Sequence, residues 1–168
     1  GPRRAFDRDT WETPPRTPPQ CPVRPTCCTP RRTLRHPLTP QSTDDMSHYV
    51  LKTDLRDVPS GFELFHCATG CFWGSEAGFW RTPGVYSTAV GYINGHVDNP
   101  SYEAVCTGRT GHTEGVRVVY DPSKVSFYDI MRVFLESHDP TQKNGQGNDR
   151  GTQYRSGVYP TTKAQYEL

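Results

Sequence analysis

Ten of the 16 prolines in this 168-residue chain lie between Pro2 and Pro40. A proline lacks an amide hydrogen and disrupts the interior of helices and sheets. The apolar residues between these prolines are scattered singly, so the segment cannot bury enough surface to offset the entropy of ordering it. We therefore predict a disordered Pro/Arg-rich N-terminal segment over 1–45, a linker over 46–61 and one folded domain over 62–168.

The composition of this N-terminal segment leaves two interpretations open. Between Thr13 and Thr43 it carries five arginines and no acidic residue, which is typical of organelle transit peptides. The prolines oppose the amphipathic helix that mitochondrial import favours, so a disordered tail is preferred and organelle targeting is the alternative. Six cysteines without a recognisable secretory signal favour reduced thiols, so we expect an intracellular, cytoplasmic protein.

A regular alternation of strand and helix patterns begins at residue 62. Ser126 resembles a helix cap for the clearest amphipathic pattern, and Gly and Pro residues separate the other segments. The predicted strands are 62–68, 85–92, 113–120 and 154–159, the predicted helices are 72–81 and 127–135, and 101–106 is ambiguous. The order β-α-β-β-α-β predicts an α+β fold, a ferredoxin-like two-layer sandwich with long functional loops at 93–112 and 139–152.

Cys71 lies where the first predicted strand ends and the first predicted helix begins. The start of a helix stabilises negative charge, which lowers the pKa of a thiol and favours the nucleophilic thiolate. Glycines at 70 and 74 leave the sulfur open, and Phe72 and Trp73 offer an apolar wall. This pattern predicts a nucleophile beside a pocket, whereas a lone buried cysteine is more often a small core residue.

Four motifs carry a more specific signal: GCFWG at 70–74, NPSYEAVC at 99–106, GHTE at 111–114 and QGNDRGTQYRS at 146–156. Taken together, in this order and spacing, they closely resemble peptide methionine sulfoxide reductases of the A type (the MsrA family). The resemblance covers residues 62–168. It does not extend to residues 1–45.

The resemblance implies a role for each matched residue. In that family the cysteine of GCFWG attacks the sulfoxide sulfur, the glutamate of the GHxE segment protonates the sulfoxide oxygen, and two tyrosines hydrogen-bond that oxygen. The family's aromatic residues surround the substrate methyl group, and an aspartate holds the substrate's main chain. The matching positions are Cys71, Glu114, Tyr102 and Tyr154 for catalysis, and Phe72, Trp73 and Asp149 for substrate binding.

The implied activity is that of a peptide-methionine (S)-S-oxide reductase, an oxidoreductase that repairs free and protein-bound methionine after oxidative stress. The redox-active Cys71 would become a sulfenic acid, which a second thiol must reduce. We expect no bound cofactor, and an external thiol reductant of the thioredoxin type or dithiothreitol. The expected partners are methionine sulfoxide and this reductant, with neither nucleic acid nor membrane, and the protein is expected to be a monomer.

The sequence departs from the family in one respect. Many members carry resolving cysteines in a Gly-rich C-terminal tail, whereas no cysteine follows Cys106 here. We therefore favour a catalytic domain truncated at its C-terminus. The alternative function is that of a non-catalytic protein, which binds methionine sulfoxide but does not turn it over. Cys106 is expected to be structural and Cys67 to be buried, and Arg155 is expected to form a scaffold ion pair.

A different thiol enzyme is the third hypothesis. A protease-like Cys-His pair would need a histidine near Cys71, and His112 and His138 are the candidates by composition. The histidines at 66, 96, 112 and 138 do not show the spacing of a zinc site, so no metal is expected.

Overall fold

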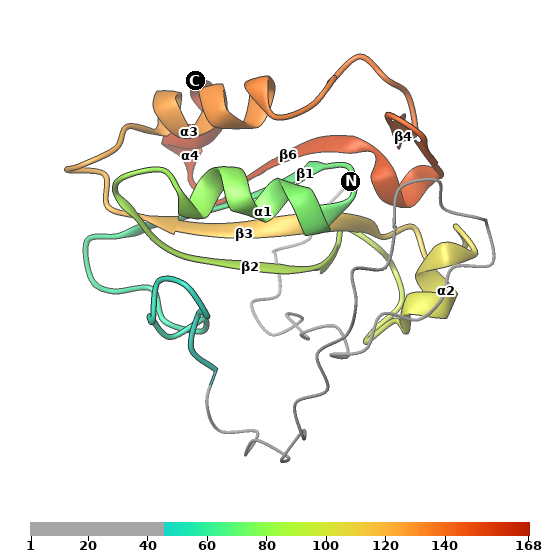
Figure 1. The fold of residues 1–168 in the computed structure, drawn as a ribbon, viewed down its shortest axis with the longest axis horizontal. Helices are drawn as coiled ribbons and strands as arrows, with labels where there is room; N and C mark the ends of the chain where they lie inside the picture. The colour runs from blue at the N-terminus through green and yellow to red at the C-terminus, as the bar shows by residue number, and fades with distance from the viewer. Residues whose placement is uncertain (1–45) are drawn as a thin grey trace, which may run out of the picture.

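The computed structural model describes residues 46–168, and the predicted disordered segment, 1–45, lies outside them. One four-stranded antiparallel sheet runs in the order β2-β3-β1-β6. Helices α1 and α3 lie over one face of it (Figure 1). The main elements are β1 (Glu63–Thr69), α1 (Phe72–Trp80), β2 (Val85–Ile93), β3 (Thr113–Tyr120), α3 (Phe127–Glu136) and β6 (Ser156–Pro160). The predicted α+β class is confirmed.

Shorter elements complete the domain at the ends of the sheet. They are α2 (Tyr102–Cys106), the hairpin of β4 (Gly145–Gln146) and β5 (Asp149–Arg150), the 3₁₀ turn η1 (Thr152–Tyr154) and α4 (Lys163–Glu167). None of the helices in residues 46–168 is long and apolar enough to cross a membrane. Of these elements, α2 and β4 lie at the end of the sheet where α1 begins, and α4 lies at the other end (Figure 1).

The hydrophobic core lies between the sheet and its two long helices. Successive strand residues point to opposite faces, so Phe65 and Cys67 of β1 join Phe79 of α1 and Ile130 and Phe134 of α3 in one buried cluster. All five are at most 2% exposed, and each large apolar side chain buried in this way stabilises the fold by about 1.5–3 kcal/mol. The prediction that Cys67 is buried is confirmed.

The predicted cap of α3 is present. The Ser126 hydroxyl accepts a hydrogen bond from the Asp129 main-chain N–H at 3.2 Å and donates to the Asp129 carboxylate at 2.6 Å. Such a cap satisfies one of the N–H groups that have no partner within the helix. The ambiguous segment 101–106 is also helical, since the Ser101 side chain caps α2 by accepting from the Ala104 N–H.

The strand predicted over 154–159 is wrong at its start. Residues 152–154 form η1, closed by a hydrogen bond from the Tyr154 N–H to the Gly151 carbonyl at 3.1 Å, and β6 begins only at Ser156. Aromatic and β-branched residues favour a strand locally, but contacts of the Arg155 side chain hold this segment in a turn. Sequence propensity is readily overridden by such tertiary contacts.

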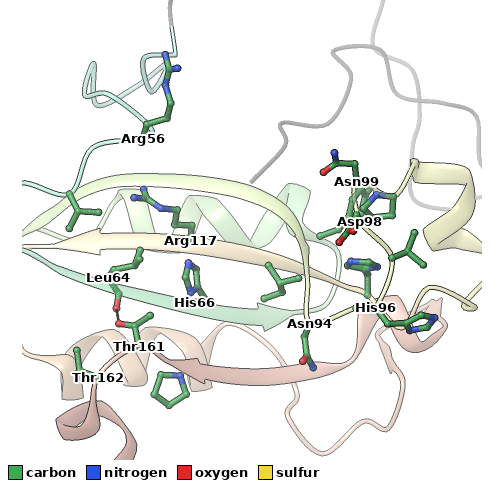
Figure 2. Close-up of a pocket in the computed structure, with 18 of the residues that line it drawn as sticks. Arg56, Leu64, His66, Asn94, His96, Asp98, Asn99, Arg117, Thr161 and Thr162 are labelled. Atoms are coloured by element: carbon green, nitrogen blue, oxygen red, sulfur yellow. Dashed lines mark hydrogen bonds between the residues drawn. The ribbon is translucent and has the colours of Figure 1, made fainter. Parts of the chain in front are cut away.

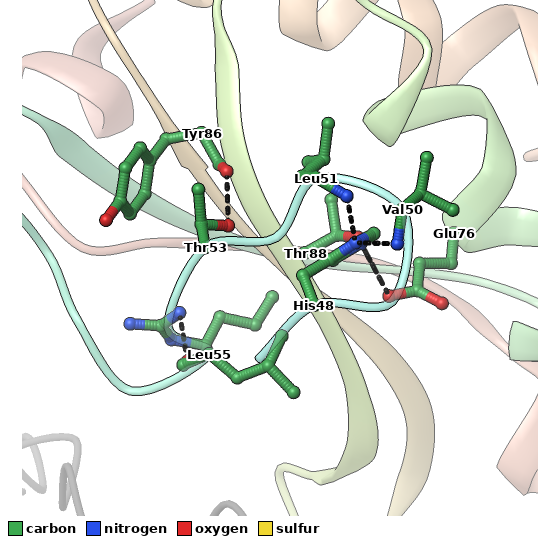
Figure 3. A network of polar contacts seen from close by, with 9 residues as sticks. His48, Val50, Leu51, Thr53, Leu55, Glu76, Tyr86 and Thr88 are labelled. Carbon is green, nitrogen blue, oxygen red and sulfur yellow. Dashed lines mark hydrogen bonds and ion pairs between the residues drawn. The ribbon is translucent and has the colours of Figure 1, made fainter. Parts of the chain in front are cut away.

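The predicted linker, 46–61, contacts both α1 and β2 (Figure 3). The Thr88 hydroxyl donates to the Glu76 carboxylate at 2.8 Å, so it accepts from His48 Nε2 at 2.7 Å. His48 Nδ1 then accepts from the N–H groups of Val50 and Leu51. Both ring nitrogens of a neutral imidazole are thereby used, which agrees with burial lowering the pKa of His48.

Candidate active site

Cys71 occupies the cap position at the start of α1, directly after β1. The preceding Gly70 has a φ of +101°, and a Cβ added there would lie 2.6 Å from the Cβ of Gln146. Only glycine accepts both the backbone conformation and this close approach. The sharp strand-to-helix junction therefore depends on Gly70, and it presents the half-exposed Cys71 at the N-terminal end of a nine-residue helix.

Glu114 on β3 is 4% exposed and lies against the start of α1. Its Oε2 accepts a hydrogen bond from the main-chain N–H of Phe72, the residue after Cys71, at 3.0 Å. Burial raises the pKa of Glu114 from 4.5 to about 7, the Phe72 N–H opposes this rise, and the charge of Asp149 adds to it. A carboxyl group with this pKa is available as an acid near neutral pH.

Tyr154 in η1 belongs to the same cluster of side chains. Its pKa lies above the ordinary value, first because the phenol is partly buried and then because of the nearby charges of Glu114, Asp149, Cys71 and Cys106. A phenol with a raised pKa keeps its proton at neutral pH and remains a hydrogen-bond donor. The sequence-predicted Tyr154 is thus close to the predicted nucleophile and to the predicted acid.

Tyr92 is a residue of this cluster that the sequence reasoning missed. It stands directly opposite Glu114 in the pairing of β2 with β3, and its ring centroid is 5.7 Å from that of Phe72. Burial, followed by the charges of Glu114, Cys106 and Cys71, raises its pKa. Only the register between the two strands could have identified Tyr92, and the sequence alone does not fix that register.

Hydrogen bonds from Arg155 hold η1 against the start of β3. The guanidinium donates to the carbonyls of Gly111, His112 and Thr152 at 2.9, 3.1 and 2.8 Å. The Thr113 hydroxyl donates to the main-chain carbonyl of Gln153 at 2.9 Å. Among residues 46–168 Arg155 forms no ion pair, so the expected scaffold role is served by hydrogen bonds to main-chain carbonyls.

Side-chain amides organise the 139–152 loop that carries Asp149. Gln146 accepts from the N–H of Asp139 at 3.2 Å and donates to its carbonyl at 3.1 Å. Gln142 makes a similar pair of bonds with Gly147, at 2.8 and 3.2 Å. A loop with its ends tied in this way can present a carboxylate in a defined position, and Asp149 is close enough to influence the pKa of both Glu114 and Tyr154.

The two predicted aromatic residues differ sharply in exposure. Phe72 is 4% exposed, whereas Trp73 is 74% exposed, and their ring centroids are 6.4 Å apart. Phe72 therefore supplies the buried wall beside Glu114. Trp73 offers a large apolar surface to solvent next to Cys71, as expected of a surface that contacts a ligand.

Tyr102 is placed relative to this cluster by the helix that carries it. It begins α2, and Cys106 ends the same helix. Residues four positions apart lie on one side of a helix, and the charge of Cys106 acts on Tyr92 and Tyr154. Tyr102 therefore lies on the side of α2 that faces the cluster.

Neither candidate histidine is placed as the partner of a Cys-His pair. His138 uses Nδ1 with the Phe134 carbonyl and Nε2 with the Ser156 hydroxyl, both at 2.8 Å. His112 lines a pocket on the other side of the sheet, and Cys71 does not line that pocket. Within the described part of the chain, no group of three or more His, Cys, Asp or Glu residues is arranged to hold a metal ion.

That pocket has a volume of about 940 Å³. Leu64, His66 and Arg117 extend into it from the strands, and His96 and Asp98 lie on the loop after β2 (Figure 2). No cysteine lines it. It therefore offers no thiol, and the Cys71 cluster is a separate candidate site.

The Cys71 cluster can act on an electrophilic sulfur that carries oxygen. A thiol at a helix start is a nucleophile, a buried carboxyl group with a pKa near 7 can give a proton, and phenols can donate hydrogen bonds to a developing oxyanion. Thiol attack, proton delivery and oxygen binding are thus available within one small region.

Several known proteins are similar to this chain in sequence and fold. The chain is 60% identical over 113 residues to the peptide methionine sulfoxide reductase MsrA of Azorhizobium caulinodans, covering 67% of this chain and 52% of that protein. It is 53% identical over 118 residues to the protein of the same name from Salmonella paratyphi B, covering 70% of this chain and 56% of the relative. The chain thus spans about half the length of the curated relatives it matches.

Solved structures agree with the sequence comparison. Methionine sulfoxide reductase A of Corynebacterium diphtheriae superposes with a TM-score of 0.66 at 50% identity, covering 70% of this chain and 55% of that one. The reduced form of Mxr1 from Saccharomyces cerevisiae gives 0.61 at 35% identity, covering 65% of each chain. The family model described as peptide methionine sulfoxide reductase matches residues 63–168. The chain therefore belongs to the A-type peptide methionine sulfoxide reductase family.

Proposed function

We propose that this chain reduces the S epimer of methionine sulfoxide, free or in proteins, to methionine, with an external thiol as the source of electrons. The observation that carries the proposal is the bond between Glu114 and the N–H of Phe72. The carboxyl group, whose pKa burial raises to about 7, lies against the residue that follows Cys71, which supports Glu114 as the acid and Cys71 as the nucleophile. The names of the relatives, which are methionine sulfoxide reductases, support the same activity.

The first step is attack of the Cys71 thiolate on the sulfoxide sulfur. The dipole at the start of α1 favours the thiolate. The sulfoxide oxygen is transferred to Cys71 as a sulfenic acid and methionine leaves as a thioether, so Cys71 is oxidised by two electrons and the substrate is reduced by two.

The oxygen must receive a proton for this transfer to be fast. In protonated Glu114, the oxygen that accepts from Phe72 acts as the carbonyl oxygen, which leaves the proton on the other oxygen. That proton can be given to the sulfoxide oxygen. We propose that the phenols of Tyr154, Tyr102 and Tyr92 donate hydrogen bonds to the same oxygen as negative charge develops on it.

The remaining residues select the substrate. We propose that Phe72 and Trp73 enclose the methyl group on sulfur, because an apolar cage favours a methyl over a polar group. Asp149 accepts a hydrogen bond from the substrate's main-chain N–H, and the bonds of Gln142 and Gln146 hold its loop in place. The start of α1 would thus contribute both the nucleophile and the apolar contacts with the methyl group, and the 139–152 loop would hold the substrate's main chain.

We also propose that the electron donor is a dithiol of the thioredoxin type and that the protein acts as a monomer inside the cell. An intracellular pool of reduced dithiols can regenerate an oxidised thiol. Residues 62–168 are proposed to form the catalytic domain, because every proposed site residue lies within them.

The activity is tested with resolved epimers of N-acetylmethionine sulfoxide and excess dithiothreitol. We expect sustained turnover of the S epimer only, and its loss in Cys71→Ser. Cys67→Ala is a matched control, because Cys67 is fully buried on β1 and should leave turnover near the unmodified rate. One mole of product per mole of protein would instead support the binder that does not turn over, and equal use of both epimers would exclude the proposal.

A further inference from the structure

Cys106 was expected to be structural, but its position suggests a second use. It is the last residue of α2 and is half-exposed, whereas its neighbour Val105 is 2% exposed and anchors the helix. Cys67, the third cysteine of the described residues, is fully buried, and burial raises its pKa. Cys106 is therefore the more accessible thiol near the site besides Cys71.

Contacts on both sides of η1 bring the two thiols to the same region. A Cβ added to Gly70, next to Cys71, would lie 4.0 Å from the Tyr154 carbonyl oxygen. A Cβ added to Gly108, just past the end of α2, would lie 3.5 Å from the Thr152 hydroxyl. The residue before Cys71 and the turn after Cys106 thus pack on neighbouring residues of one three-residue turn.

Two phenols on separate elements also indicate that Cys71 and Cys106 lie in the same region. Tyr92 on β2 and Tyr154 in η1 each lie close enough to both thiols for the thiol charges to act on them. Both thiols therefore lie near the same two phenols, which agrees with the contacts of Gly70 and Gly108 with η1. Figure 1 shows α2 at the same end of the sheet as the start of α1.

The geometry points to Cys106 as the thiol that reduces the sulfenic acid of Cys71. This inference rests on the proposed function for the origin of the sulfenic acid. The Cys106 sulfur attacks the Cys71 sulfur, the S–O bond breaks, a disulfide forms, and the hydroxyl leaves as water with the proton of the Cys106 thiol. An external dithiol then reduces the disulfide and returns both thiols, becoming a disulfide itself.

A short movement of α2 makes the bond feasible. A disulfide needs the two Cα atoms within about 7 Å of each other. Helices of only five residues have little stability of their own, and in α2 Val105 alone is buried, while Glu103 is exposed and the other three residues are half-buried. The inference requires that α2 shift toward η1 when the disulfide forms.

The test is peptide mapping of the full chain after one oxidising event. Reduced protein receives one equivalent of N-acetylmethionine S-sulfoxide, or one equivalent of hydrogen peroxide, and is then alkylated and digested with trypsin. We expect a disulfide between peptides 57–81 and 82–109 in both arms. Because Cys67 and Cys71 share peptide 57–81, the link must persist in Cys67→Ala and disappear in Cys106→Ser. In Cys106→Ser, dimedone labelling of Cys71 should rise at least about fivefold, since the sulfenic acid persists.

Each outcome separates the inference from the proposed function. A link with peroxide but not with sulfoxide supports Cys106 and excludes the reductase activity. Product formation without the link, with dimedone on Cys71 and an alkylated Cys106, overturns the inference and leaves the activity intact. A link that disappears in Cys67→Ala also overturns it, and no reaction in either arm rejects both.

Discussion

Replacing Glu114 with glutamine tests whether burial raises the pKa of the proposed acid. The side chain is 4% exposed, and burial is the main cause of the rise in its pKa from 4.5 to about 7. Each tenfold change in an ionisation constant corresponds to about 1.4 kcal/mol, so the ionised form of Glu114 destabilises the fold by about 3 kcal/mol relative to the protonated form.

The sign of the pH dependence follows from proton binding. Between pH 4.5 and about 7 the folded chain keeps a proton on Glu114 that the unfolded chain has released. Stability therefore falls as the pH rises through this window and remains lower above it. Glutamine retains an oxygen to accept from the Phe72 N–H but cannot ionise. The variant should match the unmodified chain at pH 5 and exceed its unfolding free energy by up to about 3 kcal/mol at pH 8.

Urea unfolding followed by tryptophan fluorescence measures this difference at the two pH values. The matched control is Glu136→Gln on α3, whose side chain is 72% exposed and should show no such gain. The same Glu114→Gln protein should lose about 100-fold or more in turnover, as expected when a general acid is removed. A stability difference that is equal at pH 5 and pH 8 would refute the reasoning, whatever the activity.

Three further substitutions test the supports of the site. Gly70→Ala should destabilise the fold by about 1–3 kcal/mol in urea unfolding, because φ is +101° and the added Cβ meets Gln146. The control is Gly74→Ala, which should be neutral or stabilising because no atom lies within 4 Å of the added Cβ. Equal effects of the two substitutions on the unfolding free energy would contradict this reasoning. Arg155→Met removes the donors that hold η1, so kcat/KM should fall about tenfold or more, and an unchanged value would show that η1 needs no such support. Tyr92→Phe keeps the ring contact with Phe72 and removes only the hydroxyl, so kcat should fall about tenfold with little change in KM. A kcat within twofold of the unmodified enzyme would show that Tyr92 contributes only packing.

The strand-to-helix junction at Cys71 illustrates what could be predicted from the sequence. An apolar run, a glycine and a second run rich in aromatic residues follow one another within 20 residues, so the signals are local and survive without tertiary information. The same holds for the Ser126 cap of α3, where the donor and acceptor are three residues apart.

Residues brought together by strand pairing could not be found in this way. Tyr92 and Glu114 are opposite each other only because β2 and β3 pair in one particular register. A shift of one residue would send either side chain to the other face of the sheet. Arg155 likewise reads as an ion-pairing residue, although its partners are carbonyls on a distant loop.

The sequence by itself determined the order of the main strands and helices and the family to which its motifs belong, and it singled out Cys71 as the candidate nucleophile, because these depend on neighbouring residues. The tertiary structure alone decided that Glu114 is buried against the start of α1, that Tyr92 stands opposite it, and that the segments carrying Cys71 and Cys106 both pack on η1. Burial and the field of other charges act through space, so these properties exist only once β3, α1, α2 and the 139–152 loop have come together.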